Sequence, residues 1–404
     1  MNPFGDKATV RPPILPLDRK PEVVDSPRIE RLRRDGDGEG FWREIHTHGA
    51  PLIEPAADPG HSILTFVWRG DARTRDVLVV PNRLFDRTDP SASRLRHLEG
   101  TDVWHLSYRL PSEFRCSYRF CVDEQGADEP GDEYWLRLCR TGRPDPYGTE
   151  QLTDSSVVAL PRARPQPWLA PRPDVPRGKV TRHVFESRIL GNRRPLWTYE
   201  PPVEEPSGLL VMLDGQSWFE PPALATILDN MVHERRIRPV SVIGVHSLDQ
   251  ETRTRELCCN DDFVSFLTTE LPEWAAERLR PADTRMTISG QSFGALTALY
   301  AGLRAPEHFE AVIAQSPSLW WSPDGRAHTK PAWLSGELAG ASALPSRIHL
   351  TVGDYETGIF DSTRELSRAL RGLGRKATIT EFCGGHDFAC WRAHLSDGLL
   401  AVAR

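Results

Sequence analysis

No apolar run in the 404-residue sequence approaches the roughly 18 residues that a membrane-spanning helix needs. The first residues, from Met1 to Lys7, lack the apolar core of a secretory signal peptide, so the cytoplasm is the expected compartment. A surplus of positive charge is missing too, because 50 Lys and Arg stand against 56 Asp and Glu, a net charge of −6. A nucleic-acid-binding protein would present a basic surface. We therefore expect neither a membrane nor a nucleic acid as a partner.

The sequence is equally poor in the features of a metal-binding or disulfide-rich protein. Its seven cysteines are odd in number, and none stands at a spacing typical of metal ligands. Cys258 and Cys259 are adjacent, whereas Cys383 and Cys390 are isolated. This pattern fits a reducing compartment better than a disulfide framework. We expect no metal site and no cofactor, and the sequence leaves the oligomeric state open.

Proline, in contrast, is abundant, and its distribution divides the chain. Residues 1–40 are rich in Pro, Arg and Asp and predict a mobile arm followed by a short helix. Residues 161–176 hold six prolines, which favour an extended polyproline-like backbone. They predict a semi-rigid linker between two domains, the first at 41–160 and the second at 177–404.

The first domain is predicted to be a β-sandwich of immunoglobulin-like kind. Its short runs of β-branched and aromatic residues, separated by Gly, Pro, Asp and Asn, have the period of two that strands show. These runs are 63–69, 76–80, 103–110 and 115–122. No catalytic constellation is visible among them.

The second domain is predicted to be α/β, because strand and helix patterns alternate along it. Strands are expected at 181–190, 195–199, 209–213, 240–245, 285–289, 309–314, 348–352 and 377–382. Helices are expected at 223–236, 263–279, 295–302, 362–373 and 388–402. A sheet of about eight strands, with a serine motif after a central strand, is the arrangement of α/β-hydrolases.

The serine motif is Gly290-Gln291-Ser292-Phe293-Gly294. It lies between an apolar strand and a helix-forming run, the context in which Gly-x-Ser-x-Gly forms a nucleophile elbow. The turn is so sharp that a Cβ two residues before or after the serine would collide with its neighbours, and glycine removes that atom. The alternative is a chance pentapeptide in a loop, which the flanking runs disfavour. Ser292 is therefore the candidate nucleophile.

In this fold the acid and the histidine follow the serine along the chain, on loops at the carboxyl ends of later strands. His386 follows the last strand and two glycines, so it is the candidate base. His394, inside the last predicted helix, is the weaker candidate. The loop after the strand at 348–352 offers two acids, Asp354 and Glu356, and spacing alone does not choose between them.

An ester hydrolase also needs hydrogen-bond donors for the oxyanion that forms during the reaction. One is normally the backbone N–H after the nucleophile, here that of Phe293. The second comes from the loop after the third strand, Asp214 to Trp218, where we assign the backbone N–H of Gln216. Gly215 would let that backbone approach the nucleophile.

Together these motifs resemble the enterochelin (ferric enterobactin) esterases. In the catalytic half the shared segments are Leu213–Trp218, Arg253–Leu257 with Asn260, Gly290–Gly294, Gln315–Trp321, and Gly384–Asp387 with Cys390–Arg392. In the N-terminal half they are Phe41–Trp42, Gly49–Glu54, Phe66–Arg69, Gly100–Trp104 and Asp145–Pro146. The resemblance extends from about residue 40 to the end of the chain. It is specific, because most α/β-hydrolases share only the serine pentapeptide.

The resemblance implies a cytoplasmic esterase that cleaves the tri-serine lactone of ferric catecholate siderophores such as enterobactin and so releases imported iron. The family's acid falls on Glu356, and its arginine falls on Arg253, which is expected to meet the anionic catecholates. Trp218, Trp320 and Trp321 offer stacking faces to the flat rings. The alternative is that they lie in the core, and for Trp218 and Trp320 the sequence favours neither position. Two other interpretations stay open: a general carboxylesterase acting on another ester, and a non-catalytic siderophore-binding protein on a hydrolase scaffold.

Overall fold

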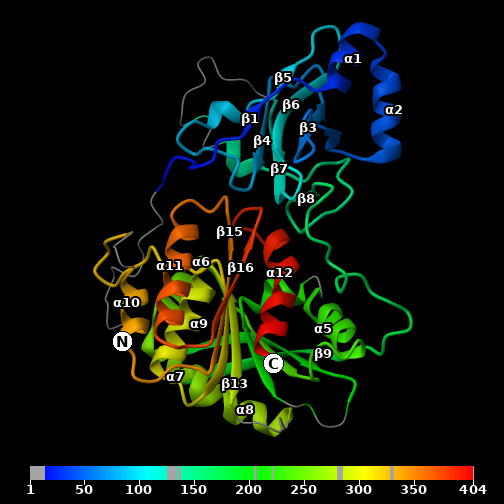
Figure 1. The fold of residues 1–404 in the computed structure, drawn as a ribbon. Coiled ribbons are helices and arrows are strands. Elements are labelled where there is room, and N and C mark those ends of the chain that lie inside the picture. The colour runs from blue at the N-terminus through cyan, green and yellow to red at the C-terminus, as the bar shows by residue number, and fades with distance from the viewer. Residues whose placement is uncertain are drawn as a thin grey trace.

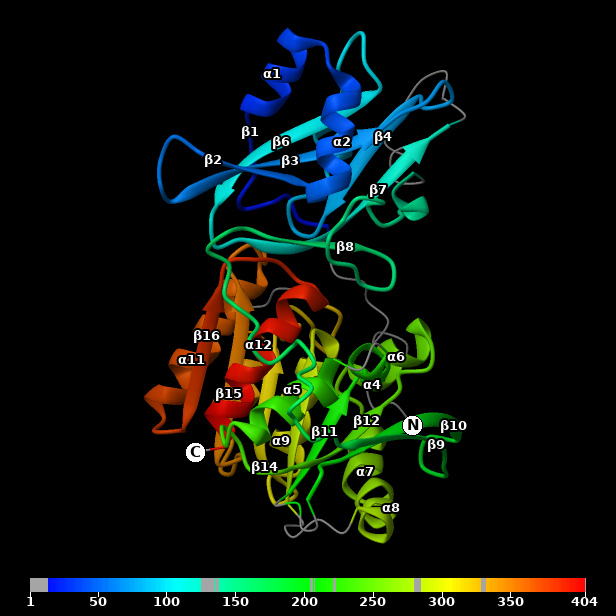
Figure 2. The same ribbon diagram turned by 90° about the vertical axis from the view of Figure 1, so that its right-hand side faces the viewer.

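A computed structural model describes residues 14–124, 134, 138–203, 206, 208–220, 223–279, 285–327 and 332–403. These residues form two parts, an N-terminal part made of two antiparallel sheets and a larger α/β part (Figure 1). The N-terminal part lies over one end of the larger sheet, as two views at right angles show (Figures 1 and 2).

The N-terminal part has the two-sheet architecture that its period-two sequence pattern predicts. One sheet has the order β1-β6-β3-β2, with β5 also paired to β6, and the other has the order β4-β7-β8. Side chains such as Phe66, Tyr108 and Phe120 are buried in the core that these strands enclose. The strands are β1 (Glu22–Val23), β2 (Leu52–Pro55), β3 (His61–Arg69), β4 (Asp76–Pro81), β5 (Arg96–His97), β6 (Val103–Pro111), β7 (Arg115–Asp123) and β8 (Ser156–Ala159).

The described residues of the predicted mobile arm are packed against these sheets. β1 pairs with β6, and two helices follow it, α1 (Pro27–Asp35) and α2 (Gly38–His48). The Ser26 side chain caps α1 by accepting a hydrogen bond from a first-turn N–H. Ile29 and Trp42 are each only 1% exposed, so burial of their apolar side chains fixes both helices to the core. Residues 1–13 lie outside the described part of the chain.

The α/β part contains an eight-stranded sheet with the order β16-β15-β14-β13-β11-β12-β10-β9. Its first two strands along the chain form an antiparallel pair at one edge, and the other six are parallel to one another. The strands are β9 (Lys179–Ser187), β10 (Asn192–Glu200), β11 (Leu209–Leu213), β12 (Ser241–Val245), β13 (Met286–Gln291), β14 (Phe309–Gln315), β15 (Arg347–Gly353) and β16 (Ala377–Phe382). All eight predicted strands are present, which confirms the predicted α/β arrangement.

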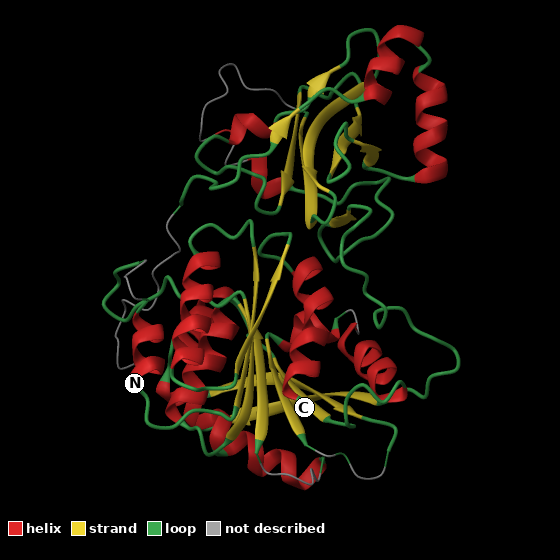
Figure 3. Ribbon diagram, in the orientation of Figure 1, coloured by secondary structure: helices red, strands yellow, loops and turns green. Residues whose placement is uncertain are grey.

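Helices cover both faces of this sheet, so the α/β part has three layers (Figure 3). On one face lie α6 (Gln250–Leu257), α7 (Asp261–Thr268), α8 (Glu270–Arg278), α9 (Phe293–Arg304), α10 (Trp333–Gly340) and α11 (Ile359–Gly372). On the other lie α4 (Gly215–Phe219), α5 (Ala223–His233) and α12 (Phe388–Val402). None of the helices within the described ranges is long and apolar enough to cross a membrane.

The helix predicted at 263–279 is divided in the structure. α7 ends at Thr268 and α8 begins at Glu270. Pro272 explains the break, because its ring would clash with the carbonyl of residue 268 in a continuous helix and it has no N–H to donate.

The proline-rich segment at 161–176 contains no helix or strand, but it includes hydrogen-bonded turns, such as those closed by the N–H groups of Leu169 and Val175, rather than a continuous extended backbone. It runs along the α/β part, because Arg164 pairs with Asp397 on α12 and Arg172 pairs with Glu234 at 2.7 Å. The boundaries of the two domains on either side remain a prediction.

The N-terminal part contacts the loops at the carboxyl ends of β15 and β16. The Arg115 N–H donates to the Cys383 carbonyl at 3.2 Å, and the Ser117 N–H donates to the Asp387 carboxylate at 2.6 Å. In open α/β sheets the carboxyl ends of the strands are where ligands bind. The N-terminal part therefore covers the edge of the sheet at which a site is expected.

Candidate active site

Ser292 sits in a strained turn between β13 and α9. Its backbone has φ 57° and ψ −118°, a left-handed conformation that is costly for a residue with a side chain. A Cβ on Gly290 would lie 2.4 Å from the Gly294 backbone, so the glycine requirement predicted from the turn is confirmed there. A Cβ on Gly294 would lie 3.4 Å from Leu213 and Asp214, which is tight but not a collision, so at that position the prediction was too strong.

His386 and Glu356 are joined by a short hydrogen bond. The distance from His386 Nδ1 to Glu356 Oε2 is 2.6 Å. Glu356 is fully buried, and it also accepts hydrogen bonds from the Ser316 hydroxyl and the Gly353 N–H, each at 2.7 Å. A buried carboxylate held in this way can fix the orientation of an imidazole and stabilise its protonated form.

Asp354, the other acid that the sequence offered, faces elsewhere. Its carboxylate pairs with Arg19 at 2.7 Å and accepts from the Gly384 N–H at 3.2 Å. Burial raises the pKa of Asp354, while Arg19 acts in the opposite direction. Of the two acids, Glu356 is thus the one hydrogen-bonded to His386.

A chain of hydrogen bonds places Ser292 beside this histidine–glutamate pair. The Ser292 N–H donates to the Gln315 carbonyl at 2.9 Å, and the next residue, Ser316, is bonded to Glu356. Ser316 also accepts from the Trp391 indole at 2.9 Å, and that indole packs edge-on against the His386 ring at 4.9 Å.

The Ser292 hydroxyl itself is within hydrogen-bonding distance of the Ser318 hydroxyl, at 3.3 Å. The described hydrogen bonds of the site thus connect Ser292 to the histidine only through intervening residues. Bonds between a nucleophile and its base often tighten only when substrate is bound. The arrangement is therefore compatible with a serine–histidine pair.

The two predicted oxyanion donors lie at the beginnings of helices. Phe293 opens α9, and Gln216 is the second residue of α4. The first N–H groups of a helix have no partner within it, so both backbones can donate to a ligand. A Cβ on Gly215 would lie 2.6 Å from the backbone of Gly244, so only glycine lets α4 begin this close to β12.

Arg253, expected to bind the anionic substrate, is instead engaged by the protein. Its guanidinium forms two hydrogen bonds with the Asp214 carboxylate, each of 2.7 Å. Burial alone would lower the pKa of Arg253, but the Asp214 carboxylate outweighs this effect and raises the pKa. Asp214 also accepts from the Gln291 amide at 3.2 Å. Asp214, at the start of the turn that carries Gln216, is therefore hydrogen-bonded both to Arg253 and to Gln291, the residue before the nucleophile.

The predicted stacking role of the tryptophans is wrong for two of them. Trp218 has no exposed surface, its indole N–H donates to Gln291 at 3.1 Å, and its ring packs edge-on against Phe388. Trp321 is 1% exposed and packs against Trp333. Both fill the core beneath the site. Sequence alone left the pocket and the core open for Trp218 and favoured the pocket for Trp321, because an aromatic residue beside an active-site motif gives the same sequence pattern in either position.

We predict that Arg253→Ala destabilises the protein by about 3 kcal/mol, because it leaves the Asp214 carboxylate buried without its cation. The same change should lower kcat, since Asp214 anchors the turn that carries Gln216. Urea unfolding and ester hydrolysis measure the two effects. Arg255→Ala is the matched control: Arg255 is exposed on the same helix, so its removal should change the free energy of unfolding by less than about 0.5 kcal/mol. Equal effects of the two variants would contradict this account.

Asn82 is a site residue that sequence reasoning missed. It follows β4 of the N-terminal part, and its side chain forms two hydrogen bonds with the backbone of His386. The amide oxygen accepts from the His386 N–H at 2.8 Å, and the amide nitrogen donates to the His386 carbonyl at 3.0 Å. No sequence signal could reveal this contact, because 304 positions separate the two residues.

We predict that Asn82→Ala lowers kcat about thirtyfold with little change in KM, because each of the two lost bonds contributes about 1 kcal/mol to holding the His386 loop. Asn82→Asp keeps the hydrogen-bond acceptor but not the donor. The decrease in kcat of this variant should therefore differ from that of Asn82→Ala, and the effect should again lie in kcat. Rates should be normalised to the sites that a fluorophosphonate labels, which separates misplacement of the histidine from simple unfolding. A pure loss of labelled sites, with normal kcat per site, would refute the positioning role.

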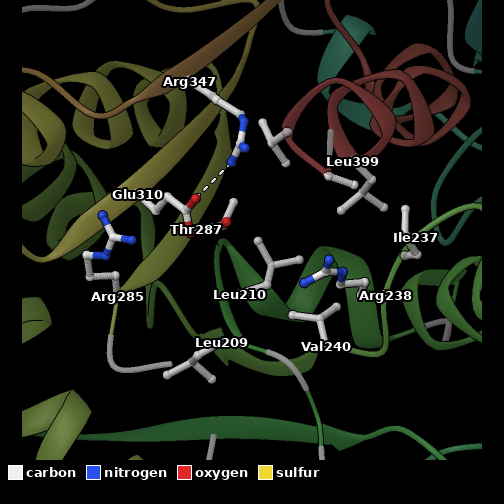
Figure 4. A pocket seen from close by; sticks show the side chains of 13 residues that line it. Leu209, Leu210, Ile237, Arg238, Val240, Arg285, Thr287, Glu310, Arg347 and Leu399 are labelled. Carbon is white, nitrogen blue, oxygen red and sulfur yellow. Dashed lines mark hydrogen bonds and ion pairs between the residues drawn. The ribbon is translucent and has the colours of Figure 1, made fainter. Parts of the chain in front are cut away.

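A cavity of about 370 Å³ lies at the opposite edge of the sheet (Figure 4). Its walls include Leu209, Thr287, Glu310 and Arg347, which stand at the amino ends of β11, β13, β14 and β15. Arg347 points to Glu310 and pairs with it at 2.8 Å. Because ligands of such sheets bind at the carboxyl ends of the strands, this cavity is not the candidate active site.

A strained serine after a central parallel strand, followed along the chain by an acid and a histidine that are hydrogen-bonded to each other, defines a hydrolase of the α/β-hydrolase class. Comparison with known proteins narrows the class. A family model described as the N-terminal part of enterochelin esterase matches residues 63–169, and one described as putative esterase matches residues 187–402.

Individual relatives match across both halves. An iron(III) enterobactin esterase of Dickeya dadantii is 33% identical over 406 residues, covering 89% of this chain and 92% of the relative. An iron(III) salmochelin esterase of Escherichia coli is 29% identical, with the same coverage of both chains. The crystal structure of the Shigella flexneri enterobactin esterase in the presence of enterobactin superposes with a TM-score of 0.78 at 27% identity, covering 91% of this chain and 98% of the other. The chain belongs to the iron(III) enterobactin esterase family.

Proposed function

We propose that the protein hydrolyses the ester bonds of the tri-serine lactone in catecholate siderophores of the enterobactin type, in the cytoplasm, after the ferric complex has been taken up. The observation that carries this proposal is the 2.6 Å bond between His386 and Glu356 at the carboxyl edge of a sheet whose chain matches enterobactin esterases along both halves.

In the proposed reaction, the Ser292 hydroxyl attacks the ester carbonyl while His386 Nε2 takes its proton. Glu356 accepts the hydrogen bond from Nδ1–H and stabilises the imidazolium. The backbone N–H groups of Phe293 and Gln216 donate to the oxyanion of the tetrahedral intermediate. His386 then protonates the departing seryl oxygen, and an acyl-enzyme remains.

A water molecule completes the cycle. It attacks the acyl carbonyl, and its proton passes to His386. When the second tetrahedral intermediate collapses, the carboxylic acid leaves and the proton returns to Ser292. Each turn of this cycle adds the elements of one water to the substrate, so a cyclic trilactone first becomes a linear trimer.

Incubation of the protein with ferric and iron-free trilactone, followed by mass analysis, tests the proposal. We expect a linear trimer that is heavier than the trilactone by one water, and smaller linear fragments if its remaining esters are also cut. Simple aryl esters serve as the comparison substrates. Hydrolysis of the aryl esters with the trilactone left intact would contradict the proposal and favour a general carboxylesterase. Binding of the ferric complex without any product would favour a non-catalytic siderophore-binding protein.

A further inference from the structure

A cavity of about 280 Å³ lies where the N-terminal part meets the loops of the candidate active site. The N-terminal part contributes Ile14, Leu15 and Leu17, the end of β4, and the segment after β4 with Asn82, Arg83, Phe85 and Arg87. The catalytic half contributes Trp320 and Thr357. A cavity of about 150 Å³ is enough to hold a benzene molecule, so this one can hold a substituted aromatic ring.

Two contacts and one chain neighbour place this cavity beside the proposed catalytic residues. Trp320 packs against Phe293, the neighbour of Ser292, with 5.6 Å between ring centroids. Thr357 directly follows Glu356 in the chain. Arg83 lies against the loop of His386, since a Cβ on Gly385 would lie 2.8 Å from Arg83 Cγ.

Arg83 is the unusual residue in this wall. Its backbone has φ 61°, a left-handed conformation that costs free energy for any residue with a side chain. The side chain is half-buried, and among the residues that the structure describes it has no hydrogen bond or ion pair. Burial lowers the pKa of Arg83, and the Glu356 carboxylate opposes this effect, yet a guanidinium stays charged near neutral pH.

A half-buried cation with no anionic partner among the described residues calls for one, because removal of a charge from water is costly unless the charge is compensated. Its neighbours also suit a flat ring, since Trp320 and Phe85 line the same cavity. The arginine that sequence reasoning assigned to the anion, Arg253, is occupied by Asp214. Arg83 is a cation at the site without such a carboxylate partner among the described residues.

We propose that this cavity is a subsite for one negatively charged aromatic arm of the substrate, and that Arg83 makes the enzyme prefer the charged, ferric form. This inference rests on the proposed function. In the ferric complex the catecholate oxygens carry net negative charge. In the iron-free compound the phenolic hydroxyls, like that of tyrosine with its pKa of about 10, are largely protonated at neutral pH.

The test compares KM for the ferric and iron-free trilactones in the wild type and in Arg83→Gln. Glutamine removes the charge but keeps a polar side chain and the same backbone strain. We expect KM for the ferric form to rise about tenfold, the loss of one hydrogen bond to a charged group, and KM for the iron-free form to rise much less. Raising the salt concentration should increase KM for the ferric form in the wild type and have less effect in the variant.

Two further variants complete the design. Arg83→Lys restores the positive charge and should recover part of the preference for the ferric form. Arg96→Gln removes an exposed arginine on β5, in the same part of the protein but outside the cavity wall, and should leave the ratio of the two KM values as in the wild type.

The possible failures are distinguishable. If the wild type cleaves neither trilactone, the proposed function fails and the subsite falls with it. If the wild type cleaves both forms but Arg83→Gln leaves the ratio of the two KM values unchanged, or raises both equally, the subsite alone is refuted.

Discussion

Ser292→Ala is expected to lower kcat for trilactone hydrolysis by about 10⁴-fold or more. The variant removes the only atom that forms the acyl-enzyme, and other groups of the site cannot replace it, so only the weak catalysis of the oxyanion donors and of binding would remain. The fold should survive, because alanine is smaller and keeps a Cβ in the same strained turn. Steady-state hydrolysis, followed by mass analysis of the products, gives the kcat, and circular dichroism checks the fold.

Ser318→Ala is the informative companion of this variant. It removes the hydroxyl that lies 3.3 Å from that of Ser292 but leaves the nucleophile in place. We expect it to lower kcat by less than about tenfold, the effect of one neutral hydrogen bond. Retained turnover in Ser292→Ala, or a loss in Ser318→Ala of the same size, would contradict the assignment of the nucleophile.

Glu356→Gln should lower kcat by about 10⁴-fold, the second-largest effect in this account. Glutamine has nearly the same shape, but it has no negative charge to stabilise the imidazolium and can present an N–H where His386 needs an acceptor, which favours the wrong tautomer. Hydrolysis of the trilactone over a range of pH measures the change in kcat.

Asp354→Asn provides the matched comparison, since both acids lie on the loop after β15. Asp354 pairs with Arg19 and with the Gly384 N–H and not with His386, so its amide variant should lose less than about tenfold in kcat. A greater loss in Asp354→Asn than in Glu356→Gln would mean that the wrong acid has been assigned.

Much of the fold could be predicted from sequence because the relevant interactions are local. Period-two alternation predicted the longer strands of the N-terminal part, and apolar runs between helix patterns predicted the strands of the eight-stranded sheet. The glycine at 290 reports a backbone contact only four residues away. The order of serine, acid and histidine along the chain placed all three at one edge of the sheet. The hydrogen bond of His386 to Glu356 agrees with the acid that the family resemblance implied.

The rest depended on contacts between residues far apart in the chain. Arg253 was expected to face the substrate, but its guanidinium is hydrogen-bonded to the carboxylate of Asp214, which lies 39 positions earlier in the chain. Sequence could not decide between pocket and core for Trp218, and it wrongly favoured the pocket for Trp321. Burial of a side chain depends on tertiary packing, which a local pattern does not contain. Asn82 and Arg83 lie in a part of the sequence with no catalytic pattern, and only the docking of the two halves brings them to the site.

The most direct test of the central claim is to trap the acyl-enzyme. The wild type is mixed with ferric trilactone, quenched in acid within one turnover and digested, and the peptides are mapped by mass. This account predicts that the peptide containing Ser292 carries the mass of the opened siderophore, with the adduct on Ser292 itself. An adduct on another residue, or multiple turnovers in Ser292→Ala under the same conditions, would contradict it.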